Sequence, residues 1–205
     1  MSIAICWSDY GSIKSEFSRN LLSTVHQDLY DRQVIKEVIS FSGSSLCSNR
    51  NKVTKLFLET GIEWALFVDA DIIISKDLVY RLYDLALSNR IDILSGLYYI
   101  YQNNHIVPAA YVEDILDMSK DVLEASWAGL GAVLVNRKAL VHSILVNEYS
   151  DGFWFAEIGS GEDHFFFNNI KSHGYKVYVS PTTIFSHIKD KEIAYKDYML
   201  QSYER

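Results

Sequence analysis

An apolar run that ends in two aspartates, at residues 64–71, constrains the fold of this chain more than any other feature. Its central residues, 65–68, have the length and composition of a buried strand. Because side chains alternate between the two faces of a strand, Asp69 and Asp71 are expected to leave the same face where the strand reaches the edge of a sheet.

Two carboxylates placed so close together need a partner. At a separation of about 4 Å and an effective dielectric of about 20, they repel by about 4 kcal/mol. A divalent cation removes this repulsion, and ligation by oxygen alone suits Mg²⁺ or Mn²⁺. The alternative is that Asp71 caps a following helix or turn, while Asp69 is a satisfied residue at the end of the strand.

Helix and strand patterns alternate through the first half of the chain. Strands are predicted at residues 3–7, 34–41, 65–68 and 91–101, the last interrupted at Ser95 and Gly96. Helices are predicted at residues 17–29, between a capping Ser48 and a terminating Gly61, and after a capping Ser75. This alternation predicts an α/β domain whose central sheet is mixed, mainly parallel and flanked by helices.

The second half is less regular. A helix is predicted from Ser160-Gly161-Glu162-Asp163 to Ser172, and the last residues, 189–205, are expected to be a peripheral helix or tail. Gly129 and Gly131 permit a close approach of backbone to a ligand, or simply a tight turn. Strands are predicted at residues 106–112, 132–135 and 175–179, and the segment 182–188 that follows carries His187.

Bulk properties narrow the class of protein. A chain of 205 residues fits one compact domain, and its net charge of −7 makes stable binding to nucleic acid unlikely. Cys6 and Cys47 lack metal-ligand spacing and are expected to be free thiols in a reducing compartment. No apolar run approaches the about 20 residues of a membrane span, so we expect a cytoplasmic protein.

Taken in order, the motifs resemble those of the GT-A glycosyltransferases. They are the Arg50-Asn51 pair at a helix start, the Asp69–Asp71 motif, Gly161-Glu162-Asp163 and the late His187. The closest resemblance is to the large inverting, family 2-like group that includes small bacterial and phage enzymes. It implies one Rossmann-like GT-A domain over residues 1–205. Residues 1–100 would bind the nucleotide sugar and residues 101–188 would provide the acceptor and catalytic half.

The resemblance also implies a nucleotide-diphosphate sugar as donor and Mn²⁺ or Mg²⁺ as cofactor. By position, Asp71 would be the direct metal ligand, and Asp69 would contact the donor ribose, or the metal through water. His187 would complete the metal shell, although without the other motifs it is better explained as a surface or strand-end histidine. The chemistry agrees, because a bound cation stabilises the departing phosphates.

Transfer also needs a base that takes the acceptor proton. Asp163, or less favourably Glu162, matches the position of the family's base, which favours inversion at the anomeric carbon although retention stays open. The alternative is structural: Ser160 and Asp163 have the spacing of a helix cap, and acids in a first helical turn are stabilised by the helix dipole.

Further residues match family positions that surround the donor. Arg50 and Asn51 would contact the nucleotide, since the arginine fork suits a diphosphate, although Arg50 could also be a solvated residue near a helix start. Trp7 and Asp9 would flank the base, but Trp7 could equally belong to the core. Residues expected near the donor sugar or acceptor are Trp127, Gly129 and Gly131, with Tyr98, Tyr99 and Trp154 as stacking rings.

Two other functions compete. A haloacid-dehalogenase-type phosphohydrolase would use Asp69 as nucleophile and Asp71 as general acid, but Ile73 and the position deep in the chain depart from that pattern. A non-catalytic GT-A-like module would bind a sugar nucleotide or a partner without cleaving it. The acceptor, whether glycan, protein, small molecule or modified nucleic-acid base, is left open by the sequence, as is the oligomeric state.

Overall fold

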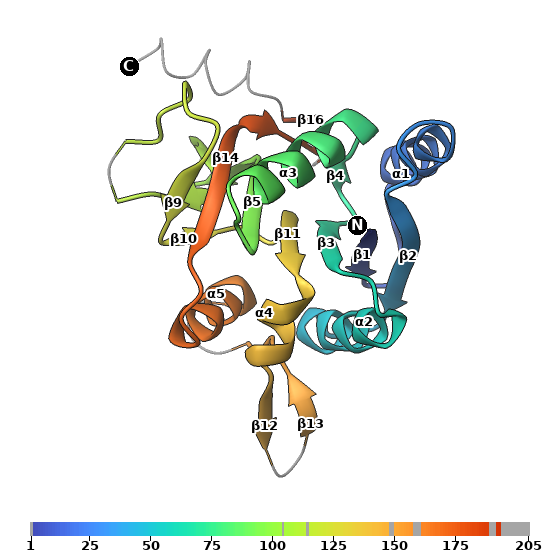
Figure 1. The fold of residues 1–205 in the computed structure, drawn as a ribbon, viewed down its shortest axis with the longest axis vertical. Coiled ribbons are helices and arrows are strands. Elements are labelled where there is room, and N and C mark those ends of the chain that lie inside the picture. Colours follow the sequence, from blue (N-terminus) through green and yellow to red (C-terminus); the bar gives the residue numbers. More distant parts are fainter. Residues whose placement is uncertain are drawn as a thin grey trace.

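The computed structural model describes residues 2–103, 105–113, 115–147, 150–157, 161–188 and 192–193. They form a single α/β domain around a seven-stranded sheet (Figure 1). The strand order is β2 (Ile35–Ser42), β1 (Ile3–Asp9), β3 (Trp64–Asp69), β11 (Ala132–Asn136), β5 (Ile93–Leu97), β14 (Val177–Ile184) and β9 (Leu123–Ala125). Strands β11 and β9 run antiparallel to their neighbours and the others run parallel to one another, so the predicted mixed, mainly parallel sheet is confirmed.

Helices cover both faces of the sheet, and each face has its own apolar core. Along β1, Ile3 and Ile5 point into one core while Ala4 and Cys6 point into the other, as the alternation of a strand buried on both faces requires. The first core is closed by α1 (Ser15–Leu29) and α3 (Lys76–Ser88), and the second by α2 (Leu46–Thr60), α4 (Arg137–His142) and α5 (Glu162–Ser172).

The predicted helices of the first half are present, with one correction to their caps. Ser45, and not Ser48, caps α2, because the Ser45 hydroxyl accepts a hydrogen bond from the Ser48 backbone N–H at 3.3 Å. Ser75 caps α3 as predicted, and Gly61 ends α2 with a φ of 74°, a conformation that favours glycine.

Strand β3 ends at Asp69, and Ala70 and Asp71 follow it in a turn. The chain then turns into the short β4 (Ile72–Ile73), which belongs to a different, three-stranded sheet with β15 (Ser186–Ile188) and β16 (Glu192–Ile193). The strand alternation expected to relate Asp69 to Asp71 therefore stops at Asp69. The two carboxylates are positioned by separate elements.

The second half contains short paired strands that the sequence patterns did not resolve. The strand expected at residues 91–101 breaks at Tyr98 rather than at Ser95 and Gly96, and the one expected at 106–112 divides at Ala109. Helix α4 was not predicted, nor was the β12–β13 hairpin, which projects from the body of the domain (Figure 1). The small pairings are β6 (Tyr99–Gln102) with β7 (His105–Pro108), β8 (Ala110–Tyr111) with β10 (Trp127–Ala128), and β12 (Leu145–Asn147) with β13 (Ser150–Phe153).

Two further predictions can be compared with the described residues. No helix among them is both long enough and apolar enough to cross a membrane. Cys6 is buried, Cys47 is half-buried, and both are free thiols. Of the predicted C-terminal helix or tail, only Glu192 and Ile193 lie within the described residues, and they form β16.

Candidate functional site

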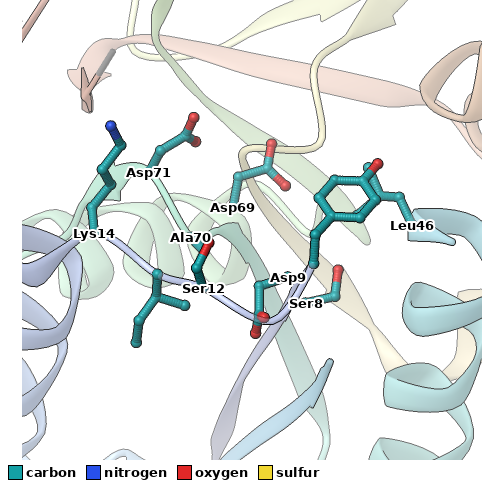
Figure 2. A pocket seen from close by; sticks show the side chains of 10 residues that line it. Ser8, Asp9, Ser12, Lys14, Leu46, Asp69, Ala70 and Asp71 are labelled. Atoms are coloured by element: carbon teal, nitrogen blue, oxygen red, sulfur yellow. The ribbon is translucent and has the colours of Figure 1, made fainter. Parts of the chain in front are cut away.

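A pocket of about 540 Å³ opens at the carboxyl ends of the parallel strands β1 and β3 (Figure 2). This volume falls in the range of about 300–1,000 Å³ that is usual for small-molecule sites, and ligands of open α/β sheets bind at this edge. We call it the acidic pocket, because three aspartates reach it. Its lining consists of Ser8, Asp9, Tyr10, Ser12, Ile13, Lys14, Leu46, Asp69, Ala70 and Asp71.

Beside the acidic pocket, one arginine holds three carboxylates together. Arg50, on α2, is only 5% exposed, and its guanidinium donates to Asp69 at 2.7 Å, to Glu162 at 2.9 Å and to Asp163 at 3.0 Å. A buried charge persists only when it is paired and hydrogen-bonded. The Arg50 cluster, meaning Arg50 with these three acids, thus joins the end of β3 to the start of α5.

The cluster shifts the pKa values of its members. Burial opposes the charge on Arg50, but the neighbouring Asp69 and Asp163 raise its pKa above the ordinary value. Burial raises the pKa of Asp163 to about 6; Arg50 lowers it in part, whereas the carboxylates of Asp69 and Glu162 add to the rise. Asp163 is therefore a carboxyl group that loses its proton just below neutral pH, as suits a general base.

Asp163 is also positioned by a backbone donor. The Leu130 N–H donates to Asp163 Oδ2 at 3.2 Å, so the segment after β10 contacts the first turn of α5. The helix begins with Gly161 as its N-cap residue, at a φ of 98° and without a side-chain cap bond. Ser160, the capping residue considered in the sequence, lies outside the described residues. The Asp163 carboxylate thus accepts hydrogen bonds from Arg50 and from the Leu130 N–H.

The second aspartate of the motif pairs with the late histidine. His187, on β15, lies 3.1 Å from Asp71, measured from Nε2 to Oδ2, and its Nδ1 lies 3.1 Å from the Tyr99 carbonyl oxygen. The pairing of β15 with β4 brings them together, since His187 is opposite Ile72 in that ladder. His187 is 5% exposed and, unlike Asp71, is not among the described residues that line the acidic pocket.

The donor atoms at this edge are of the kind that hold Mn²⁺ or Mg²⁺, namely two carboxylates with an adjacent imidazole. Within the described ranges, no three His, Cys, Asp or Glu side chains converge closely enough to form a complete metal site. Asp71 and His187 form the pair already in contact, while Asp69 turns one oxygen to Arg50. Asp71 and His187, with Asp69 beside them, are therefore the side chains that could hold a cation at this edge.

The residues expected near the nucleotide take different positions. Asp9 lines the acidic pocket, and its carboxylate accepts from the Gly11 N–H and the Ser42 hydroxyl. Trp7 packs edge-on against Phe17, with ring centroids 5.3 Å apart, and does not line this pocket.

Asn51 binds a neighbouring segment. Its side-chain oxygen accepts from the N–H groups of Trp154 and Phe155 at 2.8 and 3.1 Å, and its amide donates to the Phe155 carbonyl at 2.8 Å. Asn51 thereby fastens residues 154–155 to α2, beside the Arg50 cluster.

The two glycines make room for a tyrosine ring. A Cβ on Gly129 would lie 2.0 Å from the Tyr98 hydroxyl oxygen, and a Cβ on Gly131 would lie 2.7 Å from Tyr98 Cζ. The Gly131 N–H donates to that hydroxyl at 3.1 Å, and burial raises the pKa of Tyr98 well above its usual value. Close approach is thus required here, as the sequence indicated, but the group that approaches is Tyr98.

Some rings considered for sugar stacking are unsuitable. Tyr98 is 5% exposed, and Tyr99 and Trp154 are 0% exposed, so none of them presents a face to a ligand. Conversely, the loop between β1 and α1 was not predicted to belong to the site. It lines the acidic pocket with Tyr10, Ser12, Ile13 and Lys14. Its position after a parallel strand could have indicated this, because ligands of α/β sheets bind at that edge.

Comparisons with known proteins agree with this geometry at the level of fold. No family model matches the sequence, and no curated protein matches it. Among solved structures, the chain is similar to A197 from STIV, with a TM-score of 0.65 and 20% identity over 93% of this chain and 87% of that one.

It is also similar to GalNAc-T7, whose structure was solved with UDP, GalNAc and Mn²⁺. The TM-score is 0.59, with 12% identity over 92% of this chain and 44% of that one, so this chain spans less than half the length of GalNAc-T7. At these identities the similarity shows the fold alone. The chain has the GT-A-like fold of glycosyltransferases, as its motifs predicted.

Proposed function

We propose that this protein is a glycosyltransferase that moves a sugar from a nucleotide-diphosphate donor to an acceptor hydroxyl with the help of Mn²⁺ or Mg²⁺. The observation that carries the proposal is the convergence of Asp69, Asp71 and Asp163 at one sheet edge of a GT-A-like fold. The same residues support the proposal that the protein is similar to the inverting, family 2-like group.

The donor would occupy the acidic pocket. Asp71 and His187 would hold the cation, with Asp69 beside them toward the ribose, and the bound cation would stabilise the charge of the departing diphosphate as a Lewis acid. Lys14 lines the same pocket and can contact a phosphate. Asp9 would bind a polar edge of the nucleotide. Arg50 would fix Asp69 and Asp163 in their relative places, so that donor and base are positioned by one side chain.

Asp163 would be the general base. Its pKa of about 6 leaves the carboxylate largely deprotonated at neutral pH. The acceptor hydroxyl would give its proton to Asp163 as its oxygen bonds to the anomeric carbon and the bond to the diphosphate breaks. A single displacement of this kind inverts the anomeric carbon. Glu162, the alternative base, accepts a hydrogen bond from the same arginine at 2.9 Å.

One competing function loses support from the fold. A haloacid-dehalogenase-type phosphohydrolase would need a different fold, whereas this chain has a GT-A-like one. The binding-module alternative shares every feature of the donor pocket and differs only in leaving the donor uncleaved. Measurement of donor cleavage therefore decides between enzyme and module.

The first test is donor binding. Thermal unfolding is followed with a panel of nucleotide sugars, in Mn²⁺ and in EDTA, for the native chain, for Asp71→Ala and for Asp84→Ala. Asp84 is a matched control because it is an exposed acid paired with Arg32, away from the pocket. We expect one donor to raise the unfolding temperature only with metal, in the native chain and Asp84→Ala but not in Asp71→Ala. No donor-specific shift, or a shift that persists in Asp71→Ala, contradicts the proposal.

The second test is cleavage of that donor, followed as release of nucleoside diphosphate. Asp71→Ala should lose about 1,000-fold in rate, or about 4 kcal/mol of transition-state stabilisation. Asp84→Ala should retain the native rate. Binding without any release in the native chain would assign the protein to the non-catalytic class.

The third test separates binding from chemistry at Asp163. Asp163→Asn should still be stabilised by donor and metal while it abolishes transfer, because an amide cannot take the proton. A near-normal rate in Asp163→Asn would remove it as the base. Loss of rate in Glu162→Gln alone would transfer that role to Glu162.

A further inference from the structure

A second pocket, of about 530 Å³, is lined by His164 from the first turn of α5 and by residues of β6, β7, β8 and β10. We call it the aromatic pocket. Its volume is again within the range of about 300–1,000 Å³ of small-molecule sites. The residues that matter for the argument are Gln102, Tyr111, Ser126, Trp127 and His164.

Three rings form its platform. Trp127 and Tyr111 are directly opposite each other in the antiparallel pair of β10 and β8, so their side chains leave the same face. The imidazole of His164 stacks on Trp127, with ring centroids 4.9 Å apart and an angle of 12° between the planes. Tyr111 is 61% exposed, which leaves its ring available to a ligand.

The platform is joined to the proposed base by short connections. His164 follows Asp163 directly, so their Cα atoms are about 3.8 Å apart. Strand β10, which carries Trp127, ends at Ala128, and the Leu130 N–H just beyond it donates to Asp163. The Gly129 N–H donates to the Ala109 carbonyl at 2.8 Å, which fixes this segment to the neighbouring wall of the pocket. A ligand on the platform would therefore contact the same segment and the same helical turn that position the base.

The two pockets differ in charge. The acidic pocket includes Asp9, Asp69, Asp71 and Lys14, whereas no Asp, Glu, Lys or Arg is among the described residues that line the aromatic pocket. Its polar groups are an amide, hydroxyls and an imidazole. An acceptor with a phosphate backbone would need several lysines or arginines. A neutral sugar ring instead presents an apolar face to aromatic rings and a rim of hydroxyls to such polar groups.

We propose that the aromatic pocket binds the acceptor, and that the acceptor is a neutral sugar whose ring packs on Tyr111 and Trp127. This inference rests on the proposed function, because it names the acceptor of that reaction. Trp127 and Tyr111 supply the stacking surface, and Gln102 and Ser126 supply polar contacts at the rim.

The test uses simple glycosides as probes, observed by saturation-transfer NMR. The probes are the methyl glycosides of glucose, galactose and N-acetylglucosamine, with methyl glucuronide as the charged counterpart. The variants are Trp127→Ala and Tyr111→Ala, the latter at an exposed position where folding is little affected. Tyr30→Ala is the matched control, since Tyr30 is an 82% exposed tyrosine beside His26, outside the pocket. Circular dichroism checks that each variant is folded.

We expect at least one neutral glycoside to bind the native chain and Tyr30→Ala equally. Loss of either platform ring should weaken its binding by about tenfold, which corresponds to about 1.4 kcal/mol. The glucuronide should bind more weakly than its neutral counterpart. No binding of any neutral glycoside, equal binding by a folded Tyr111→Ala, or preference for the glucuronide would overturn the proposal.

Donor titrations on the same samples keep the two proposals apart. If Trp127→Ala and Tyr111→Ala lose the glycoside but retain metal-dependent stabilisation by the donor, both proposals are supported. If the native chain binds a donor and no glycoside, the acceptor inference fails and the proposed function stands. If a glycoside binds and no donor does, the proposed function fails, and the acceptor role of the aromatic pocket fails with it.

Discussion

Asp163 is linked to both pockets, through Arg50 to Asp69 of the acidic pocket and by its neighbour His164 to the aromatic pocket, and the two pockets are built in opposite ways. The acidic pocket forms where long parallel strands end, and its charges are fixed by buried partners such as Arg50 and His187. The aromatic pocket forms on two-residue strands and presents rings with no charged side chain among its described lining residues. Asp163 therefore marks a boundary between a region held together by charged side chains and a region built from uncharged aromatic rings.

The same contrast is visible between two arginines. Arg50 is 5% exposed and contacts three acids, whereas Arg32 pairs with one acid, Asp84, at 2.7 and 2.8 Å on the surface, and its guanidinium lies 4.7 Å from the centroid of the Tyr80 ring. Both form good hydrogen bonds, but only the buried one would leave uncompensated charges behind if removed. Exchange of each arginine for methionine shows how much more a buried arginine contributes to the free energy of unfolding than an exposed one.

The largest effect is expected from Arg50→Met. It leaves Asp69, Glu162 and Asp163 without their cation in a partly buried place, and loss of one partner from a buried ion pair costs about 3–5 kcal/mol. Arg32→Met, the matched control, removes an exposed pair and should cost about 0–1 kcal/mol. Urea unfolding measures the free energy of unfolding of each variant. Equal losses would show that the Arg50 cluster is no more than a surface ion pair in its energetics.

The charged region was largely predictable from the sequence, because its determinants are local. The apolar run before Asp69, the cap of α3 and the terminating Gly61 are each visible within a few residues, whereas the cap of α2 is Ser45 and not the predicted Ser48. The position of Asp71 after the strand, and not on it, was missed because a two-residue β4 gives no periodic signal.

The aromatic region could not be predicted in the same way. Strands β8 and β10 have two residues each, too few to show alternation, and they pair only because the surrounding fold brings them together. The link from Arg50 to Glu162 and Asp163 spans more than a hundred residues, so no local pattern reveals it. Burial explains the remaining errors, since Tyr99 and Trp154 have aromatic rings suited to sugars but lie wholly in the core.

An intermediate effect is expected from Asn51→Ala. Asn51 binds the backbone of residues 154–155 through three hydrogen bonds, and its loss leaves backbone groups unsatisfied, at about 1–3 kcal/mol. Asn89→Ala is the control, since Asn89 is an exposed amide that donates only to its own helix. Urea unfolding gives the stability of both variants, and a donor titration gives the affinity. Lower stability with unchanged affinity would show that Asn51 only joins α2 to residues 154–155. A large loss of affinity would instead place Asn51 in the donor site.

The smallest effect, and the one that tests the boundary most directly, is the pH dependence of the rate. A base with a pKa of about 6 gives a kcat/KM that rises with pH below 6 and levels off above it, because only deprotonated Asp163 accepts the proton. The Glu162 carboxylate helps to raise the pKa of Asp163, and Glu162 also shares Arg50 with it. Glu162→Gln removes one negative charge and leaves Arg50 to Asp69 and Asp163, so the rising limb should move to lower pH.

Glu124→Gln is the control for this profile, because Glu124 is an exposed acid paired with Lys176 and should leave the limb in place. Donor cleavage is measured at a fixed ionic strength across the acid range for all three proteins. A limb that stays where it is in Glu162→Gln would show that the titrating group is not Asp163, and a limb that moves to higher pH would reverse the sign of the interaction. A shift to lower pH would mean that the charges around Arg50 set the pKa of the base. The base would then be tuned by the charged region, while the aromatic pocket on the other side of the boundary selects the acceptor.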